Sequence, residues 1–311
     1  AELERLSDGA RIDITDGNER LIVPAGVDDL AAVLEAEPKA TIVAGSTDVG
    51  LWVTKQMRAI SPVVFIAHLP ELHRIEEGDA GVRLAACVSY TEAFAVLARR
   101  YPAMAALWDR IGGEQVRNMG TVGGNIANGS PIGDSPPPLI ALGAELTLRK
   151  GDSRRTLPLE AFFIDYGKQD REPGEFVESV FVPALPAGDR FAVYKVSKRR
   201  DEDISALCGA FRVSLDASGL VTAARIAFGG MAATPKRAKN VEAMLIGKPL
   251  TEATADEARD TFAQDFQPLT DWRASSGYRM LAAKNLLTRF VLETGGGTVQ
   301  IRRHEPALAE A

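Results

Sequence analysis

Residues 121–134, TVGGNIANGSPIGD, form the centre of the stretch of sequence that decides the fold. The wider segment 112–138 reads as the least helical part of the chain, because seven glycines interrupt it and three consecutive prolines close it. A loop of this length inside a domain is either functional or disordered, and interspersed apolar side chains such as Val122 and Ile126 argue against disorder. The paired glycines before Asn125 predict a concave surface of backbone amides that binds an anion, and a purely structural loop is the alternative.

A second glycine-punctuated loop lies earlier in the chain, where a β-branched run over 41–44 leads into the sequence AGSTDVG. Glycine lets the backbone come close to a phosphate group and adopt positive φ angles. Ser46 and Thr47 add hydroxyl donors, and the amides at the start of a following helix would complete an anion site. A plain strand-to-helix turn with Ser and Thr caps is the alternative interpretation.

The composition describes an ordinary globular protein. The chain has 311 residues, enough for two domains at about 150 residues each, and is 46% hydrophobic and 25% charged. A net charge of -6 argues against nucleic acid as a partner. No apolar run reaches about 18 residues, which argues against a membrane span. Free cysteines and the lack of a signal-peptide core at the N-terminus predict a cytoplasmic location.

The apolar periodicity divides the chain into two domains. Strands are expected over 21–23, 41–44, 63–67 and 82–88, with helices from 27 to Pro38, over 91–99 and over 103–111. The proline-rich break over 183–188 predicts a junction, so we expect domains over 1–187 and 188–297 and a polar tail over 298–311. In the second domain we expect a strand over 191–196, a hairpin of 206–215 and 220–228, and helices over 237–246, 253–263 and 276–293.

Several common functional patterns are missing from the sequence. Ser130 stands where a Walker A loop needs lysine, and neither a GxGxxG nor a GxSxG motif occurs. Two cysteines and three histidines are too few for an iron–sulfur cluster or a histidine-rich metal site. Cys87 and Cys208 sit in apolar strand patterns and are expected to be small buried side chains. The mixed-charge run over 198–203 is typical of a solvated hairpin end.

The two loops, in this order and about 75 residues apart, resemble a known family. AGSTDVG followed by GEQVRNMGTVGGNIANGSPIGD is similar to the FAD-binding domain of the molybdenum hydroxylases, the xanthine dehydrogenase family above all. The run YKVSKRRDEDISALCGAFRV is similar to the start of that family's C-terminal flavoprotein domain. The resemblance implies an α+β fold: an FAD-binding fold of the vanillyl-alcohol-oxidase/p-cresol-methylhydroxylase type with two subdomains, plus a C-terminal flavoprotein α+β domain.

The resemblance also implies which residues bind the cofactor. Those that would cradle the FAD pyrophosphate are Val43, Ala44, Gly45, Ser46, Thr47, Asp48, Val49, Gly50, Thr121, Val122, Gly123, Gly124 and Asn125. Asp134 would hold the adenosine side of FAD, and the backbone of Val177 would touch the cofactor. Lys195 matches a lysine near the flavin ring, where a cation stabilises reduced flavin. Ile111 matches a position that is often aromatic and covers the ring, so an aliphatic lid is expected here.

By this resemblance the chain would be the FAD module of a xanthine dehydrogenase that oxidises hypoxanthine and xanthine. Electrons would reach FAD from [2Fe–2S] clusters and a molybdenum cofactor on other segments or subunits of a hetero-oligomer, and NAD would accept a hydride. The 199–203 run matches a loop that tunes the choice between NAD and oxygen. One alternative is the FAD-binding medium subunit of a carbon monoxide or aldehyde dehydrogenase with another acceptor; another is a non-catalytic interaction module. No metal ligand or certain catalytic residue is expected in the chain itself.

Overall fold

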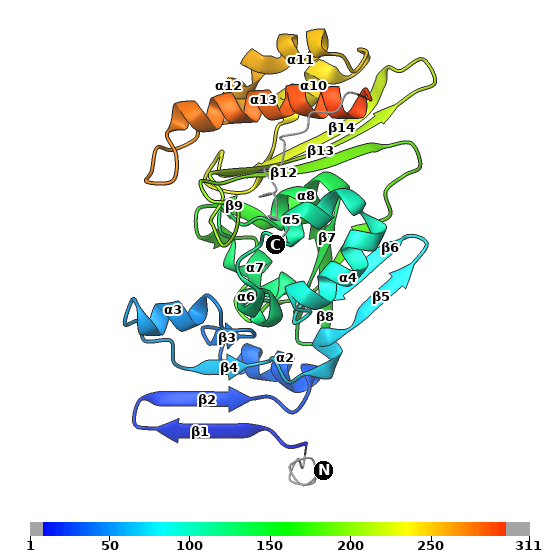
Figure 1. Ribbon diagram of the computed structural model, residues 1–311. Coiled ribbons are helices and arrows are strands. Elements are labelled where there is room, and N and C mark those ends of the chain that lie inside the picture. The colour runs from blue at the N-terminus through cyan, green and yellow to red at the C-terminus, as the bar shows by residue number, and fades with distance from the viewer. Residues whose placement is uncertain (1–8, 297–311) are drawn as a thin grey trace, which may run out of the picture.

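The computed structural model describes residues 9–296, which fold into three units stacked along the long axis of the molecule (Figure 1). Each unit has its own sheet and its own cluster of buried apolar side chains. Helices and strands are mixed throughout, so the expected α+β class, with two FAD-domain subdomains and a C-terminal domain, is confirmed. The junction expected at residue 187 falls between the second and third units, and the tail expected over 298–311 lies outside the described residues.

The N-terminal unit is a four-stranded sheet in the order β1-β2-β4-β3, antiparallel only between β1 and β2. Its elements are β1 (Ile12–Asp16), β2 (Glu19–Val23), α2 (Val27–Ala36), β3 (Thr41–Val43), α3 (Val49–Thr54), β4 (Val63–Phe65) and the 3-10 helix η1 (Pro70–His73). Leu30 and Leu34 of α2 pack with Ile22 and Val64 of the sheet, as the strand–helix–strand pattern predicted. The sequence reading missed β1, a short strand in which Ile12 and Ile14 alternate with polar residues but all five residues are exposed.

The middle unit is an antiparallel five-stranded sheet in the order β5-β6-β11-β7-β8. Its strands are β5 (Ile75–Gly78), β6 (Gly81–Ala85), β7 (Glu145–Lys150), β8 (Ser153–Pro158) and β11 (Phe176–Pro183), with a small hairpin of β9 (Phe163–Asp165) and β10 (Lys168–Gln169). Its helices are α4 (Tyr90–Arg100), η2 (Pro102–Met104), α5 (Ala105–Trp108), α6 (Glu114–Met119), α7 (Val122–Asn128), α8 (Pro136–Leu142) and α9 (Leu159–Phe162). A capping box of Ser89 and Glu92 starts α4.

The prediction that residues 112–138 form a loop is wrong, because α6, α7 and the start of α8 lie within them. Glycine disfavours a helix interior, but Gly123 and Gly124 stand in the first turn of α7, where Thr121 caps the helix. A Cβ on Gly123 would lie 2.6 Å from the Ala86 backbone, so close packing requires glycine there. The three prolines occupy the first turn of α8, where the amides that they lack would have no helical partner.

The C-terminal unit is an antiparallel four-stranded sheet, β12-β13-β14-β15, with the unit's own helices on one face (Figure 1). Its elements are β12 (Arg190–Val196), β13 (Leu207–Leu215), β14 (Val221–Gly229), β15 (Lys236–Arg237), α10 (Lys239–Leu245), α11 (Glu252–Ala258), η3 (Arg259–Thr261), α12 (Phe262–Asp265) and α13 (Ser276–Thr294). The predicted hairpin and long last helix are confirmed. Phe290 of α13 stacks on Phe211 of β13 at 5.3 Å, while α8 of the middle unit packs against β13 and β14.

Charged side chains tie the middle unit to the C-terminal sheet. Arg225 of β14 donates to the Ile140 carbonyl of α8 and to Glu160 of α9, at 2.8 and 2.7 Å. Arg212 of β13 donates to the Leu142 carbonyl at 3.1 Å. These contacts fix how the two units meet, and the cavity described next lies at that meeting.

Candidate functional site

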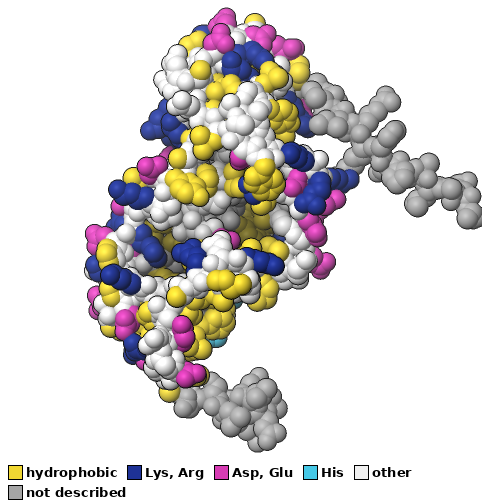
Figure 2. All heavy atoms as spheres, turned by 90° about the vertical axis from the view of Figure 1, so that its left-hand side faces the viewer, with side chains coloured by type: hydrophobic (Ala, Val, Ile, Leu, Met, Phe, Trp, Pro, Cys, Tyr) yellow, Lys and Arg dark blue, Asp and Glu magenta, His cyan; other side chains and the backbone are white. Residues whose placement is uncertain are grey.

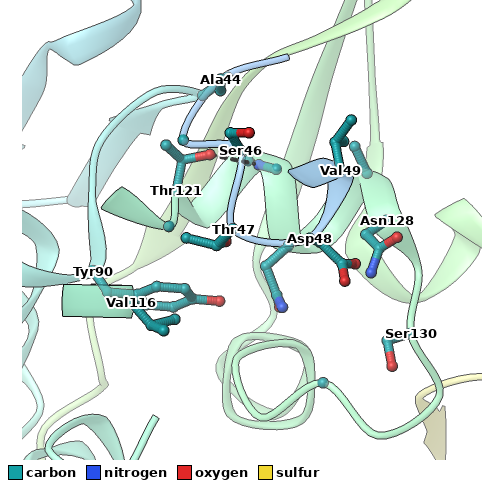
Figure 3. Close-up of a pocket in the computed structure, with 18 of the residues that line it drawn as sticks. Ala44, Ser46, Thr47, Asp48, Val49, Tyr90, Val116, Thr121, Asn128 and Ser130 are labelled. Atoms are coloured by element: carbon teal, nitrogen blue, oxygen red, sulfur yellow. Dashed lines mark hydrogen bonds between the residues drawn. The ribbon is translucent and has the colours of Figure 1, made fainter. Parts of the chain in front are cut away.

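A cavity of about 630 Å³ opens where the three units meet. Residues 39–42 and 44–49 of the N-terminal unit line it, together with segments of the middle unit and, from the C-terminal unit, Lys195 and 202–204. Figure 2 shows the hollow, with apolar side chains inside it, on the face at the left of Figure 1. In Figure 3 the 44–49 loop faces Tyr90, Asn128 and Ser130 across this space. The cavity therefore depends on the relative placement of all three units.

Most of the residues expected to bind the cofactor share this cavity. Those that line it are Ala44, Gly45, Ser46, Thr47, Asp48, Val49, Ile111, Thr121, Gly123, Gly124, Asn125, Asp134, Val177 and Lys195. Val43, Gly50 and Val122 do not line it, and Val122 is instead fully buried in the core of the middle unit. The two loops that are distant in sequence are thus brought together around one space.

The loop between β3 and α3 offers unpaired backbone donors to the cavity. Ser46 has a φ angle of 60°, in the left-handed region that non-glycine residues seldom occupy. Within the described part of the chain, no group accepts a hydrogen bond from the backbone amides of residues 45–48. Successive amides around a left-handed residue form a concave anion-binding nest. The expected anion-binding capacity of this loop therefore has a structural basis in its free N–H groups.

The start of α7 differs from the amide nest that the sequence predicted there. The Val122 amide donates to the Val88 carbonyl, the Gly123 amide to the Ala86 carbonyl and the Gly124 amide to Thr121 Oγ1, at 3.0 to 3.1 Å. These first-turn amides already have protein partners, so they are not free to bind an anion. What the glycines provide is close approach, since any side chain on Gly123 would collide with Ala86.

A buried ion pair lies where the middle and C-terminal units face each other. Lys195 Nζ lies 2.5 Å from Asp134 Oδ2, and the two side chains are 2% and 9% exposed. Ser205 Oγ donates to the other carboxylate oxygen at 2.5 Å. Sequence resemblance assigned Asp134 to the adenosine side of FAD and Lys195 to the flavin ring. One extended FAD cannot present its two ends to two groups in direct contact, so at most one of these roles applies.

Arg110 of the middle unit positions the charged run over 198–203 at the edge of the cavity. Arg110, just after α5, donates to the Lys195 carbonyl, to Ser197 Oγ and to the Arg200 carbonyl at 2.8 to 3.1 Å. The run is exposed through Glu202, as expected of a solvated hairpin end, but Glu202 and Asp203 also line the cavity. The role of Arg110 could not be predicted from the sequence, because two of its three partners are backbone carbonyls 85 and 90 residues later in the chain.

The two described histidines and the two cysteines lie away from the cavity lining. His68 and His73 bond to the carbonyls of Pro24 and Ala67, and residues 9–296 contain no group of three or more metal-binding side chains. Cys87 and Cys208 are buried free thiols, as predicted. Burial raises the pKa of Cys87 to about 12. Burial, aided by the negative charge of Asp134, raises the pKa of Cys208 well above its ordinary value.

Sequence reasoning missed several cavity-lining residues. Tyr90 is the first residue of α4, and Arg171 and Lys39 bring positive charge to the lining. The capping box at Ser89 marks the start of α4 but says nothing about which helix end meets a cavity. These residues come from different elements, so only the fold assembles them.

Two family models together match most of the chain. Residues 16–185 match the family model of the FAD binding domain in molybdopterin dehydrogenase. Residues 192–294 match the model of the CO dehydrogenase flavoprotein C-terminal domain. Among the described residues, no helix is both long enough and apolar enough to cross a membrane.

Some relatives match this chain along nearly their whole length, whereas others are much longer proteins of which it spans only a part. The putative xanthine dehydrogenase FAD-binding subunit XdhB of Escherichia coli K12 is 30% identical, over 88% of this chain and 95% of its own length. Xanthine dehydrogenase of Emericella nidulans is 33% identical over 78% of this chain, which spans only 19% of that longer protein. A carbon monoxide dehydrogenase structure from Hydrogenophaga pseudoflava superposes with a TM-score of 0.81 at 28% identity, covering 89% of this chain and 96% of the matched chain.

Proposed function

Because this chain belongs to the family of FAD-binding domains of molybdopterin dehydrogenases, we propose that it holds FAD in the cavity between its units. The row of unpaired amides over residues 45–48 carries this proposal, since it offers a pyrophosphate several hydrogen bonds without displacing any protein partner. A cavity of about 630 Å³ is also within the usual size range of cofactor sites. A module that had lost its cofactor would have no need of either feature.

The chain's own residues would bind and orient the cofactor. The amides at 45–48 would hold the phosphate oxygens, and the packing of Gly45 on Met119 keeps that loop in place. Ile111 and Val177 would exclude water with their apolar side chains. FAD, when bound, supplies chemistry that joins one-electron carriers to two-electron carriers. The Lys195–Asp134 pair would set the local field, and because the two charges are adjacent the net field is smaller than that of a lone lysine.

We further propose that the complete enzyme is a xanthine dehydrogenase that oxidises hypoxanthine and xanthine and in which NAD is the final acceptor. The similarity to the putative E. coli xanthine dehydrogenase FAD-binding subunit XdhB along 95% of its length supports this choice. The [2Fe–2S] clusters and the molybdenum cofactor would lie on other segments or subunits of a cytoplasmic hetero-oligomer. This division follows from the two cysteines of the chain, because a [2Fe–2S] cluster takes about four ligands.

A second candidate is the FAD-binding medium subunit of a carbon monoxide or aldehyde dehydrogenase that uses another acceptor. The match of residues 192–294 to a CO dehydrogenase flavoprotein model and the superposition on a carbon monoxide dehydrogenase favour it. Both candidates use the same cavity, so they differ in the electron acceptor and in the partner chains.

The visible spectrum of the purified chain tests the shared part of the proposal. Bound oxidised flavin absorbs at about 370 and about 450 nm as a property of the cofactor. A folded, colourless protein that takes up no FAD would contradict both candidates. Anaerobic addition of NADH then separates them, because bleaching of the band near 450 nm is expected only of the NAD-linked enzyme.

A further inference from the structure

We propose, on the basis of the FAD binding proposed above, that Ser135 and Tyr90 are positioning residues for the Asn125 side chain. They hold the Asn125 carbonyl oxygen away from the cofactor, so that Nδ2 donates into the cavity to a phosphate oxygen. The loop motifs assigned no role to Ser135 or Tyr90.

The side chains of Tyr90, Ser135 and Asn125 form a short hydrogen-bonded row at the cavity wall, in which Ser135 alone does not line the cavity. Ser135 Oγ donates to Asn125 Oδ1 at 2.6 Å and lies 3.3 Å from the Tyr90 hydroxyl. Ser135 is 0% exposed and Tyr90 is 4% exposed, whereas Asn125 is half-buried and lines the cavity beside Tyr90. The row therefore runs from a buried phenol, through a buried hydroxyl, to an amide at the cavity surface.

The number of protons on each group decides which group donates and which accepts in these two hydrogen bonds. A serine hydroxyl has one proton, and the carbonyl oxygen of an asparagine can only accept. Since Ser135 donates to Asn125, its oxygen is left to accept the proton of the Tyr90 hydroxyl. Asn125 Nδ2 then keeps both protons, and within the described residues no group accepts from it.

An anion in the cavity favours this direction over the reverse. In the reverse arrangement Nδ2 would donate to Ser135, and the Asn125 carbonyl oxygen would face the phosphate, where two acceptors repel each other. Asn125 matters because the first-turn amides of α7 are already used within the protein. Unlike the first-turn backbone amides, Asn125 Nδ2 therefore remains available to donate to a phosphate.

The Tyr90 phenol is itself held in place by Trp108. Trp108 Nε1 donates to the Tyr90 carbonyl at 3.0 Å, and the two rings pack edge to face at 5.5 Å. Burial, with the negative charge of Asp134, holds the pKa of Tyr90 above its ordinary value. The hydroxyl therefore keeps its proton at neutral pH and remains a donor to Ser135.

Substitution of Ser135 in the full chain tests the role directly. Ser135→Ala frees the Asn125 amide to turn over, and we expect the Kd for FAD, measured by flavin fluorescence quenching, to rise about tenfold. Tyr90→Phe should raise it less, because Ser135 can still donate. Tyr101→Phe is the matched control, since Tyr101 is a buried phenol that bonds to the Val182 and Pro183 carbonyls outside the cavity lining. It should lower stability without changing the Kd.

Two variants of Asn125 separate positioning from general packing. In an Asn125→Ala background, Ser135→Ala should change the Kd less than about twofold, because the group that it orients is gone. Asn125→Asp keeps the shape and the contact with Ser135 but replaces the donor by a negative charge, so it should bind FAD more weakly than Asn125→Ala.

The outcomes separate this assignment from FAD binding itself. A wild-type chain that binds FAD, with a Ser135→Ala variant that binds it equally well, overturns the positioning role and leaves the proposed function intact. Additive effects in the double variant, or an Asn125→Asp variant that binds like wild type, also overturn it. A folded wild-type chain that takes up no FAD overturns both.

Discussion

Gly45 shows at the residue scale how two loops are locked together. A Cβ at this position would lie 1.6 Å from the Met119 carbonyl oxygen and 2.5 Å from its carbon, so the backbone of one loop would have to move. We expect Gly45→Ala to lower the free energy of unfolding by about 1–3 kcal/mol through overpacking. Because the loop that moves carries the free amides, FAD binding should be lost as well. Denaturant unfolding and FAD titration measure the two effects.

Gly277→Ala is the matched control for this substitution. Gly277 lies in the first turn of α13, and nothing stands within 4 Å of a Cβ there. Alanine should leave FAD binding unchanged and raise stability by up to about 1 kcal/mol. Equal FAD affinity in wild type and Gly45→Ala would show that the loop does not hold the cofactor.

The Lys195–Asp134 pair leads to a second prediction at this scale. Removing one partner leaves a buried charge without compensation, so Lys195→Ala and Asp134→Asn should each cost about 3–5 kcal/mol of stability. Their effects on flavin should have opposite signs. Loss of the cation disfavours reduced flavin and lowers the midpoint potential, whereas loss of the carboxylate charge raises it.

Potentiometric titration of the FAD-bound variants measures this effect. A change of about 1.4 kcal/mol corresponds to about 30 mV for a two-electron couple, which is the size of shift that we expect. Equal potentials in wild type and both variants would place the pair too far from the ring to act on it. Lys195→Met combined with Asp134→Asn should be more stable than either single variant, because no lone charge remains.

At the scale of elements, the sequence predicted the helices and strands whose apolar residues recur at regular spacing. It failed for helices that tertiary packing stabilises against the intrinsic preferences of their residues. The spacing of α2 was readable because this helix buries one face, and the β13–β14 hairpin was readable as two apolar runs about the turn over 216–219. The helices over 112–138 could not be predicted in this way, since glycine and proline disfavour helices in general. Thr121, the Ala86 contact and the position of Pro136 at a helix start reverse that preference, and two of these depend on tertiary structure or exact register.

Strand β11 is anchored at its start by an ion pair that should respond to pH. Arg155 of β8 donates to both oxygens of buried Glu175 at 2.7 Å, and these bonds hold the pKa of Glu175 below its ordinary value of 4.5. A lowered folded-state pKa stabilises the protein above the unfolded pKa, and this stabilisation is lost as pH falls through the folded value. We expect Glu175→Gln to cost about 1 kcal/mol at pH 7, since solvent screens the half-exposed Arg155.

Unfolding measured across pH tests this assignment. The difference in stability between wild type and Glu175→Gln should shrink steadily as pH falls below about 4.5, because protonated Glu175 resembles glutamine. A difference that is the same at pH 7 and at pH 3 would mean that packing, and not the charge, fixes the start of β11.

At the scale of the whole molecule, the site exists only because three units converge. Each glycine loop could be found in the sequence, and the resemblance gave their order, yet neither indicated which amides are free. The amides of 45–48 and those at the start of α7 look equivalent in sequence, and only hydrogen-bond partners distinguish them. The contact between Lys195 and Asp134, 61 residues apart, likewise depends on the docking of β12 against the middle unit.

The two cysteines lead to the last prediction, which concerns what the isolated chain does. Both thiols are buried in separate places, Cys87 in the N-terminal core and Cys208 on β13, so they cannot supply the four thiolates of one [2Fe–2S] cluster. We expect the purified chain, loaded with FAD, to transfer electrons between NADH and a soluble dye but not to oxidise xanthine. Iron analysis and anaerobic assays with each reductant measure this. Adding the partner chains that carry the iron–sulfur clusters and the molybdenum cofactor should restore purine oxidation, because the flavin module then receives electrons from them. Xanthine-dependent bleaching of the flavin in the isolated chain would contradict this division of labour.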